Sequence, residues 1–161
     1  MRLIFSLVIT LFLASCASMP DKIQNTPTGK PEVIINYSNV DDIKASLIAD
    51  YLIDGYTVTK DTQYLLELQR NTKGNEDIAA YFAVGNAYSS NYRLVSINLI
   101  KSDGKVRVVV TNSFKAHMPF GQVNTAEITN NKVFNFWQTY LNGLKKKFEN
   151  KTLNSESKLI N

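Results

Sequence analysis

The chain has 161 residues, of which 44% are hydrophobic and 20% charged, and its formal net charge is +4. This length is that of one ordinary domain built around one hydrophobic core. The positive charge is small and scattered instead of forming a basic stripe, which argues against nucleic acid as a partner. Because the chain has a single cysteine, it can form no internal disulfide, and its stability must come from burial of apolar side chains.

The N-terminus has the pattern of an export signal. Arg2 supplies a positive start, and residues 3–13 form an almost unbroken apolar run that ends in two small residues before the cysteine. The sequence Leu13-Ala14-Ser15-Cys16 resembles the lipobox of bacterial lipoproteins, in which the cysteine is acylated and becomes the first residue of the mature chain. The resemblance covers residues 1–16, and it implies a signal peptide at 1–15 and lipidation of Cys16.

Two alternatives to a lipoprotein are a membrane-spanning helix and an ordinary secretory signal. The apolar run is too short to span a bilayer, which needs about 20 apolar residues. An ordinary signal would leave Cys16 as a chance occupant of its position. An acylated cysteine with two or three chains anchors a protein stably, because two membrane signals already suffice. Ala17 follows the cysteine where an inner-membrane lipoprotein tends to carry aspartate, so we expect the outer membrane, at its periplasmic face.

The mature chain divides into a tether, a domain and a tail. Residues 16–30 are expected to be the lipidated N-terminus and a flexible tether, because this polar stretch contains two prolines and a glycine and lacks periodicity. A single domain is expected over residues 31–150. Residues 151–161 are expected to be a disordered tail.

The first half of the domain alternates strand and helix signals. Residues 32–37 are rich in β-branched side chains and predict a strand. A helix is predicted over 40–54, with Asn39 as its N-cap, apolar residues at spacings of four and Gly55 at its C-terminus. Within residues 56–70 we expect a strand in the second half, either alone or continuous with the first residues through a kink.

The middle of the domain contains one ambiguous segment and one strong tertiary signal. Residues 76–84 fit a short helix or a strand, and their alanine content favours the helix. Residues 92–100 and 106–114 both alternate apolar and polar side chains. The Asp103-Gly104 pair between them favours a tight turn, so these segments predict a β-hairpin.

A long connection and a long helix complete the domain. Residues 115–129 are expected to be a loop that is longer than usual. Apolar residues recur at helical spacing over 131–150, which predicts an amphipathic helix. The fold class that follows is α+β, with an antiparallel or mixed sheet of about four strands and two amphipathic helices packed on one face.

Few residues suggest catalysis or metal binding, so we expect no cofactor and no metal. His117 is the only histidine, and Ser113 precedes it by four residues, but that serine is expected in a strand and no Gly-x-Ser-x-Gly turn exposes a nucleophile. An exposed loop histidine without a catalytic role is the favoured reading. A zinc site needs several histidine or cysteine ligands. Asp41, Asp42 and Asp50 have the spacing of helix caps and a solvated face, which does not match a calcium loop.

A pair of carboxylates for glycoside hydrolysis stays open, because such pairs need only proximity in space. The four candidates are Glu67, Glu76, Asp77 and Glu127. Each also falls where a polar strand face, a helix start or a loop would place an acidic residue. A small envelope hydrolase acting on peptidoglycan or glycan is therefore the alternative function.

Two aromatic stretches are candidates for binding a protein, peptide or glycan, although burial in the core is the favoured explanation for them. The first contains Tyr81, Phe82, Tyr88 and Tyr92, and the second contains Phe114, Met118 and Phe120. The residues we expect at a partner-binding surface are Tyr88, Tyr92, His117, Met118 and Phe120. Lysines 145–147 fit a solvated helix end or a contact with anionic head groups.

The leading hypothesis is a non-enzymatic lipoprotein that binds a partner protein in the cell envelope, as an accessory in assembly, transport or secretion. It follows from an anchor joined to one domain without an evident active site. A third hypothesis is a carrier of lipid or another hydrophobic ligand, which requires a cavity between the helices and the sheet.

Overall fold

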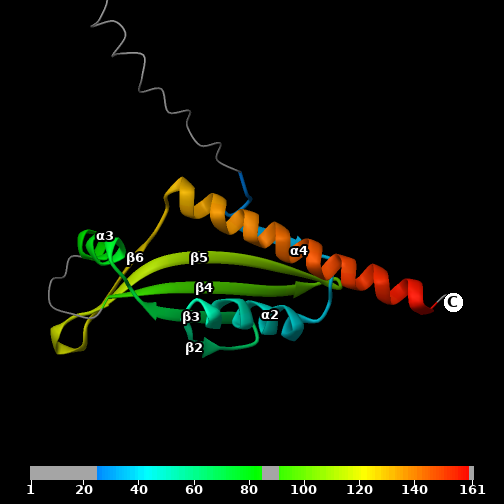
Figure 1. Cartoon of the computed structure of the whole chain (residues 1–161), viewed down its shortest axis with the longest axis horizontal. Helices are drawn as coiled ribbons and strands as arrows, with labels where there is room; N and C mark the ends of the chain where they lie inside the picture. The colour runs from blue at the N-terminus through cyan, green and yellow to red at the C-terminus, as the bar shows by residue number, and fades with distance from the viewer. Residues whose placement is uncertain (1–24, 85–90, 160–161) are drawn as a thin grey trace, which may run out of the picture.

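The computed structural model describes residues 25–84 and 91–159 (Figure 1). These residues form an α+β domain with one antiparallel six-stranded sheet and three α-helices. The elements in chain order are β1 (Glu32–Ile35), α2 (Val40–Ile53), β2 (Thr57–Asp61), β3 (Leu65–Asn71), α3 (Asn75–Val84), β4 (Asn91–Ser102), β5 (Lys105–His117), the short 3-10 turn η2 (Pro119–Gly121), β6 (Val123–Glu127) and α4 (Asn131–Leu159). The α+β class and the antiparallel sheet are confirmed, but the prediction of four strands and two helices is too low.

The strands follow the order β1-β5-β4-β3-β2, and α2 leads the chain from β1 at one edge to β2 at the other. Both β1 and β6 pair with the same edge of β5, since β1 lies along residues 106–109 and β6 along residues 113–117. Figure 1 shows α4 running along the length of the β4–β5 hairpin and past its end, whereas α3 lies at the opposite end. The long β5 therefore joins two differently covered parts of the sheet.

The β4–β5 hairpin is confirmed and is longer than predicted. Asp103 and Gly104 have φ angles of 51° and 72°, and the neighbouring residues Ser102 and Lys105 are paired in register. Positive φ at both central residues is the type I′ geometry, whose twist matches that of the flanking strands. The Asp-Gly signal therefore predicted the correct turn.

Two stretches hold more strands than the sequence suggested. Residues 56–70 form the separate strands β2 and β3 instead of one kinked strand, because the chain reverses where the Thr62 amide donates to the Leu65 carbonyl at 2.8 Å. The predicted loop 115–129 contains the end of β5, the turn η2 and strand β6. Neither reversal has the Asn-Gly or Asp-Gly signal that marks the β4–β5 turn.

Helix α2 matches its prediction. The Asn39 side-chain oxygen accepts hydrogen bonds from the amides of Asp41 and Asp42 at 3.0 and 3.4 Å, and Gly55 follows the helix with a φ of 78°. A side-chain cap satisfies amides that have no partner within the helix, and a left-handed glycine ends it. The cap and the stop were both readable from the sequence.

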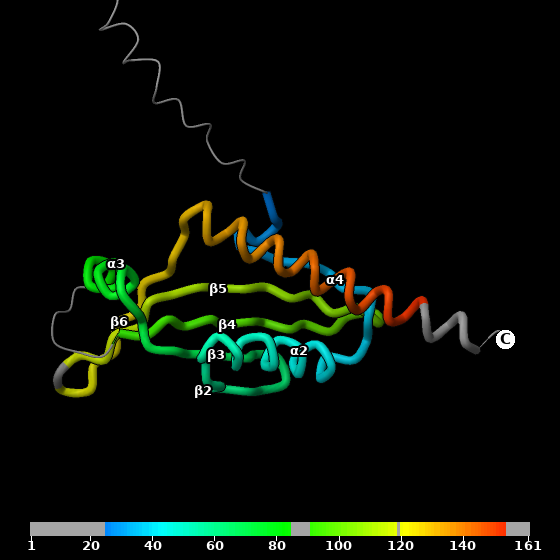
Figure 2. Tube along the Cα trace, viewed as in Figure 1, coloured from blue at the N-terminus to red at the C-terminus, as the bar shows by residue number. Residues whose placement is uncertain are grey.

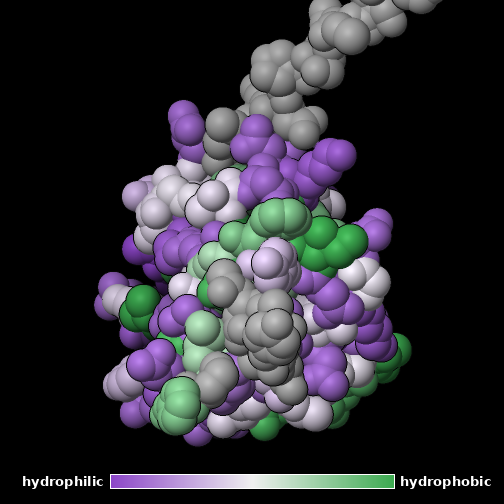
Figure 3. All heavy atoms as spheres, turned by 90° about the vertical axis from the view of Figure 1, so that its left-hand side faces the viewer, coloured by the Kyte–Doolittle hydropathy of each residue, from purple (hydrophilic) through white to green (hydrophobic). Residues whose placement is uncertain are grey.

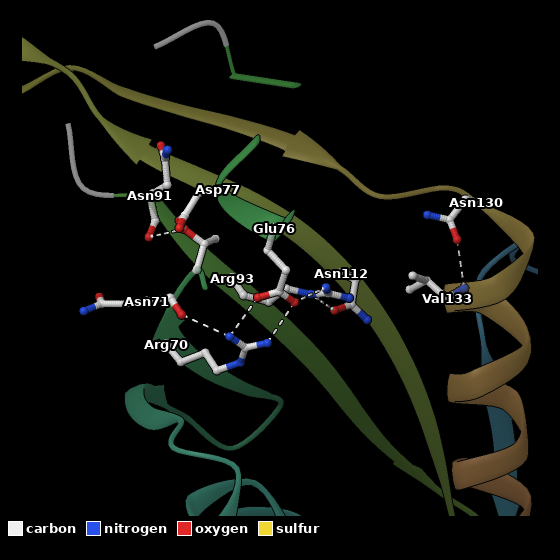
Figure 4. Close-up of polar contacts among 10 residues, drawn as sticks. Arg70, Asn71, Glu76, Asp77, Asn91, Arg93, Asn112, Asn130 and Val133 are labelled. Atoms are coloured by element: carbon white, nitrogen blue, oxygen red, sulfur yellow. Dashed lines mark hydrogen bonds and ion pairs between the residues drawn. The ribbon is translucent and has the colours of Figure 1, made fainter. Parts of the chain in front are cut away.

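The other two helices resolve or extend the predictions. Residues 76–84 lie in a helix, α3, which decides between the two alternatives. Asn130 caps α4 by accepting a hydrogen bond from the Val133 amide at 2.9 Å, as Figure 4 shows. Helix α4 continues to Leu159, so residues 151–159, which we expected in a disordered tail, are helical.

Part of the predicted tether belongs to the domain. The Gly29 amide donates to the Thr26 carbonyl at 3.0 Å, and Lys30 contacts both Thr111 and Glu127, at 3.1 and 3.2 Å. Residues 25–30 are therefore a turn held against β5 and β6. The signal peptide, Cys16 and the rest of the predicted tether, up to residue 24, lie outside the described residues.

The main core lies between one face of the sheet and the helices α2 and α4. In the strands it uses alternate residues that face each other across the ladder, such as Leu66 with Ile97 and Leu99 with Val108. Trp137 is 2% exposed at its centre, and its ring stacks on that of Tyr51 with a centroid distance of 5.3 Å. The largest fully buried side chains are Trp137, Ile35, Ile43, Leu47, Leu66, Leu68, Ile97, Leu99, Leu141, Val95, Val106 and Val108. The prediction of two amphipathic helices on one face is confirmed for α2 and α4.

A second, smaller core lies under α3, on the same face of the sheet but beyond the ends of α2 and α4. Its buried members are Ala80, Val84, Phe114 and Ala116, and Ala126 and Ile128 pack against them. The separation of α3 from the other two helices is visible in the Cα trace of Figure 2. The sheet face thus carries a gap between two groups of helices.

Candidate functional site

The predicted partner-binding residues that the structure describes gather at the α3 end of the sheet. Tyr92 is the second residue of β4 and His117 ends β5, and their rings meet edge to face with centroids 5.5 Å apart. Met118 and Phe120 follow in the turn that leads to β6. Cys16 and Tyr88 lie outside the described residues, so their predicted roles stay predictions.

Phe120 has a backbone conformation that is unfavourable for a residue with a large side chain. It is fully exposed and has a φ of 68°, while the Met118 amide donates to the Gln122 carbonyl at 2.7 Å and closes the turn. The left-handed region costs a residue with a Cβ roughly 1–2 kcal/mol. The turn thus holds a large apolar ring in solvent on a strained backbone, and such strain persists only where other contacts hold it.

The outward side of α3 adds apolar surface to the same end. Ile78, Tyr81 and Phe82 are 60%, 45% and 79% exposed, and the rings of Tyr81 and Phe82 meet edge to face at 5.4 Å. Figure 3 views the molecule from this end and shows green apolar surface gathered over α3 among polar residues. We call Ile78, Tyr81, Phe82, Phe120 and Val123 the apolar end.

Some residues of the two aromatic stretches are buried in the core, and others are exposed where they could contact a partner. Phe114 is 7% exposed and belongs to the core under α3, whereas Tyr81, Phe82 and Phe120 face solvent. Ile78 was not among the predicted residues. Its position between the acidic first turn of α3 and the two aromatics was the signal that could have identified it.

A second candidate site is a polar cavity in the gap between α3 and the other two helices. Its volume is about 520 Å³. Its lining comes from three strands and all three helices: Tyr51, Asp54, Tyr56, Arg70, Lys73, Glu76, Arg93, Asn112, Phe136 and Trp137. The floor consists of Arg70, Arg93 and Asn112 on the neighbouring strands β3, β4 and β5.

One carboxylate holds both arginines of this cavity. Figure 4 shows Arg70 and Arg93 reaching Glu76 at the start of α3. Arg70 Nη2 and Arg93 Nη1 each donate to Glu76 Oε1 at 2.9 Å, and Arg70 Nη1 lies 2.8 Å from Oε2. Arg70 and Arg93 are direct partners in the β3–β4 ladder, where like charges repel. Glu76 therefore binds α3 to the sheet and offsets this repulsion.

The pKa of Glu76 reflects these contacts. Burial raises the pKa, but the hydrogen bond from Arg70 and the charges of Arg70 and Arg93 outweigh burial and hold the pKa below its ordinary value. The pKa of Arg70 is raised despite burial, because Glu76 and the nearby Tyr56 favour its charged form. Glu76 and Arg70 are thus both charged at neutral pH.

An aromatic wall closes the cavity on the side of α2 and α4. Tyr51 and Trp137 stack there, and the Arg70 guanidinium lies 5.1 Å from the centre of the Tyr56 ring. Burial raises the pKa of the Tyr51 hydroxyl, which therefore stays protonated. Phe136 is 62% exposed at the rim. The cavity combines charged groups on its floor with apolar groups on its wall.

The four carboxylates considered for glycoside hydrolysis lie in different environments. Glu76 faces the two arginines, Asp77 accepts a hydrogen bond from Thr72, and Glu127 pairs with Lys30 at 3.2 Å. Glu67 pairs with Ser96 in the ladder and faces the sheet side opposite to the helices. Three of the four carboxylates therefore already have a side-chain partner in the fold.

The remaining catalytic and metal candidates also have structural surroundings. Ser113 and His117 are four residues apart along β5, which separates them by roughly 13 Å, too far for a hydrogen bond. Asp42 accepts hydrogen bonds from Tyr37 and Lys151, and Asp50 accepts one from Tyr140 at 2.7 Å. Within residues 25–84 and 91–159 no three potential metal ligands cluster. In the same ranges no helix combines the length and apolar character needed to cross a membrane.

The cavity was missed by the sequence analysis. Arg70 continues the inward-facing alternation of Leu66 and Leu68, and Arg93 precedes that of Val95 and Ile97. An arginine at an inward position of two successive strands was therefore the available signal. The pairing of β3 with β4 that places them side by side was not predictable from either strand alone.

Comparison of the chain with known protein families, curated proteins and solved structures finds no match.

Proposed function

We propose that this chain is a lipid-anchored protein of the outer membrane, facing the periplasm, that binds a partner protein in the cell envelope without acting as an enzyme. The lipobox at Leu13 to Cys16 supports the anchor. The apolar end supports the binding of a partner, because it exposes several large side chains at one end of a domain that has an adequate core of its own.

The observation that carries the proposal is the state of Phe120. A full exposure and a φ of 68° are both unfavourable for phenylalanine in an isolated domain. Aromatic side chains that project from a surface become binding anchors when a partner provides an apolar pocket. The partner chemistry that fits is therefore a protein surface with an apolar depression, contacted by Phe120 and by Phe82 of α3.

Site-specific photo-crosslinking in intact membranes tests this proposal. A photoreactive residue at position 120 or 82 of the full chain should capture one discrete protein. The same residue at position 64 is the matched control, because Tyr64 is 57% exposed but is not part of the apolar end. Capture of the same protein from all three positions, or of none from positions 120 and 82, would overturn the proposal.

Alanine variants separate recognition from folding. Phe120→Ala and Phe82→Ala should each weaken binding of the captured protein by about 30-fold, since buried aromatic anchors contribute on the order of 2 kcal/mol. Tyr64→Ala should leave co-purification unchanged. Circular dichroism of all three variants should match that of the wild type.

The anchor has its own test. The intact mass of the chain extracted from membranes should correspond to residues 16–161 with acyl groups on Cys16. Cys16→Ser should abolish acylation and release the chain from the membrane fraction. An unmodified chain that begins at another residue would refute the anchor and leave the partner proposal untouched.

A further inference from the structure

The polar cavity is not used by the proposed partner surface, yet it has the size of a ligand site. Small-molecule sites occupy about 300–1,000 Å³, and this cavity has about 520 Å³. Charged groups lie on its floor and an aromatic ring lies at its rim. In ligand sites, a few polar groups usually orient the ligand and apolar groups contact the rest of it. The charges and hydrogen-bond donors of its lining therefore define the kind of ligand that would fit.

The charges of the lining do not balance. Arg70, Arg93 and Lys73 are positive, whereas Glu76 and Asp54 are negative, which leaves one positive charge. On the floor the imbalance is local, because two guanidinium groups share the single carboxylate of Glu76. A ligand with one negative charge would neutralise the site, and a ligand with two would reverse its sign.

The donors of the arginines are unequally used. Arg70 directs Nη1 to the Asn71 carbonyl at 3.0 Å and Nη2 to Glu76. Arg93 directs Nη1 to Glu76 and Nε towards the Asn112 side-chain oxygen at 3.4 Å. No hydrogen bond joins Arg93 Nη2 to any other residue in the described part of the chain. A guanidinium with a free donor on its fork fits a carboxylate, which accepts in the same plane.

We propose that this cavity binds a ligand through a single carboxylate, such as the free C-terminus of a peptide or a small organic acid. Arg93 donates to the ligand carboxylate, Arg70 adds its positive charge, and Phe136 packs against the apolar part of the ligand. Asn112 holds the Arg93 side chain in place. This site is separate from the apolar end, and its occupancy does not depend on the proposed partner.

Trp137 provides a direct readout, because it is the only tryptophan and it lines the cavity. The full chain, purified in detergent, is titrated with N-acetyl-Phe-Ala, with the C-terminal amide of the same peptide, with 3-phenylpropionate and with inorganic phosphate. The peptide acid should change tryptophan emission saturably, and the amide should bind at least tenfold more weakly. Binding of 3-phenylpropionate without the peptide acid would support the carboxylate site and assign it to small acids.

Variants of the floor give changes of opposite sign. Arg93→Gln should weaken binding of the peptide acid at least tenfold. Glu76→Gln should strengthen this binding several-fold, because the Glu76 carboxylate competes with the ligand for both arginines. Lys73 contacts α3 through its carbonyl, which accepts from the Glu76 amide at 3.1 Å and is kept in Lys73→Gln. Lys73→Gln removes only the exposed charge at the rim and should weaken binding about threefold. Arg107→Gln is the control, since it breaks the Arg107–Glu32 pair on the opposite sheet face and should leave binding unchanged.

Three results would overturn the carboxylate site. The first is equal binding of the acid and the amide, and the second is phosphate binding as tight as that of the acid. The third is a folded wild-type chain whose tryptophan emission responds to none of the four compounds. None of these results bears on the crosslinking of the apolar end.

Discussion

The two ends of the sheet are stabilised in different ways. Beneath α2 and α4 the sheet face carries a continuous apolar core with Trp137 at its centre. Beneath α3 the core has four buried residues within ranges 25–84 and 91–159, and two of them are alanines. The helix is also held by polar contacts from Arg70 and Arg93 to Glu76, from Thr72 to Asp77 and from Asn124 to Val84. The first end provides stability, and the second end provides exposed apolar groups and charges.

This difference separates the part of the domain that dominates folding from the part that exposes apolar and charged groups. Beneath α2 and α4 the stability comes from the burial of apolar side chains, which has no directional requirement. Each large buried side chain contributes about 1.5–3 kcal/mol. The α3 end depends on a few directional contacts, so it should open more readily than the rest of the domain. Four measurements test this comparison, from the largest expected effect to the smallest.

Trp137→Ala should lower the free energy of unfolding by about 3–5 kcal/mol, because it removes the largest side chain of the main core and leaves a cavity. Phe136→Ala is the matched control at the neighbouring position. Phe136 is 62% exposed, and its loss should change stability by less than about 0.5 kcal/mol. Denaturant titration of both variants measures the difference. Equal losses would show that the main core does not dominate stability.

Glu76→Gln should weaken the docking of α3 by about 2 kcal/mol, because it removes charge-assisted hydrogen bonds and leaves two adjacent arginines unneutralised. Amide hydrogen exchange should become about 30-fold faster in α3 and remain unchanged in the middle of α4. Faster exchange throughout the domain would contradict the division into two ends.

Lowering the pH should destabilise the docking of α3 before it destabilises the main core. The loss of stability should be no larger than that caused by Glu76→Gln. The pKa of Glu76 is lower in the folded protein than in the unfolded chain. The stabilisation that Glu76 provides is therefore complete above the unfolded pKa, about 4.3, and is lost as the pH falls through the lower folded-state value. Hydrogen exchange of α3 measured down to this range should show the loss in the wild type. A Glu76→Gln variant with the same pH dependence would assign it to another group.

Phe120→Gly should stabilise the domain by about 0.5–1 kcal/mol, because glycine adopts a φ of 68° without the steric penalty of a side chain. The same change should weaken partner binding, because it removes the exposed ring. Phe120→Ala keeps the backbone penalty and should leave stability nearly unchanged. Thermal unfolding and co-purification measure the two effects. A loss of stability in Phe120→Gly would show that the ring supports the fold.

Local signals predicted most of the elements beneath α2 and α4. The Asn39 cap, the Gly55 stop and the Asp103-Gly104 turn each act through the backbone of a few consecutive residues, and each was found as predicted. The reversals at Thr62 and at Phe120 were missed. The first is closed by the backbone and side chain of Thr62, and threonine is only a weak turn signal. The second has a phenylalanine in the left-handed region, which this residue type rarely adopts.

The α3 end shows why the rest could not be read in the same way. Phe82 stands in an apolar stretch of the sequence and Phe114 among polar residues, yet Phe82 is 79% exposed and Phe114 is 7% exposed. Only the packing of α3 on β5 distinguishes them. The predicted residues Tyr92, His117 and Phe120 did meet at one end, because β4 and β5 pair over their whole length.

By itself, the sequence determined the α+β class, the central hairpin, the two long amphipathic helices and the expectation of a lipid anchor at Cys16. These depend on periodicity, capping and turn chemistry, all of which act over short distances along the chain. The tertiary structure alone decided that Arg70 and Arg93 lie side by side and share Glu76. It also decided that α3 and the β5–β6 turn lie at the same end of the sheet (Figure 1). These arrangements depend on strand register and helix docking. Both bring together residues that are far apart in the sequence, and the local sequence around one residue does not indicate which distant residue it will contact.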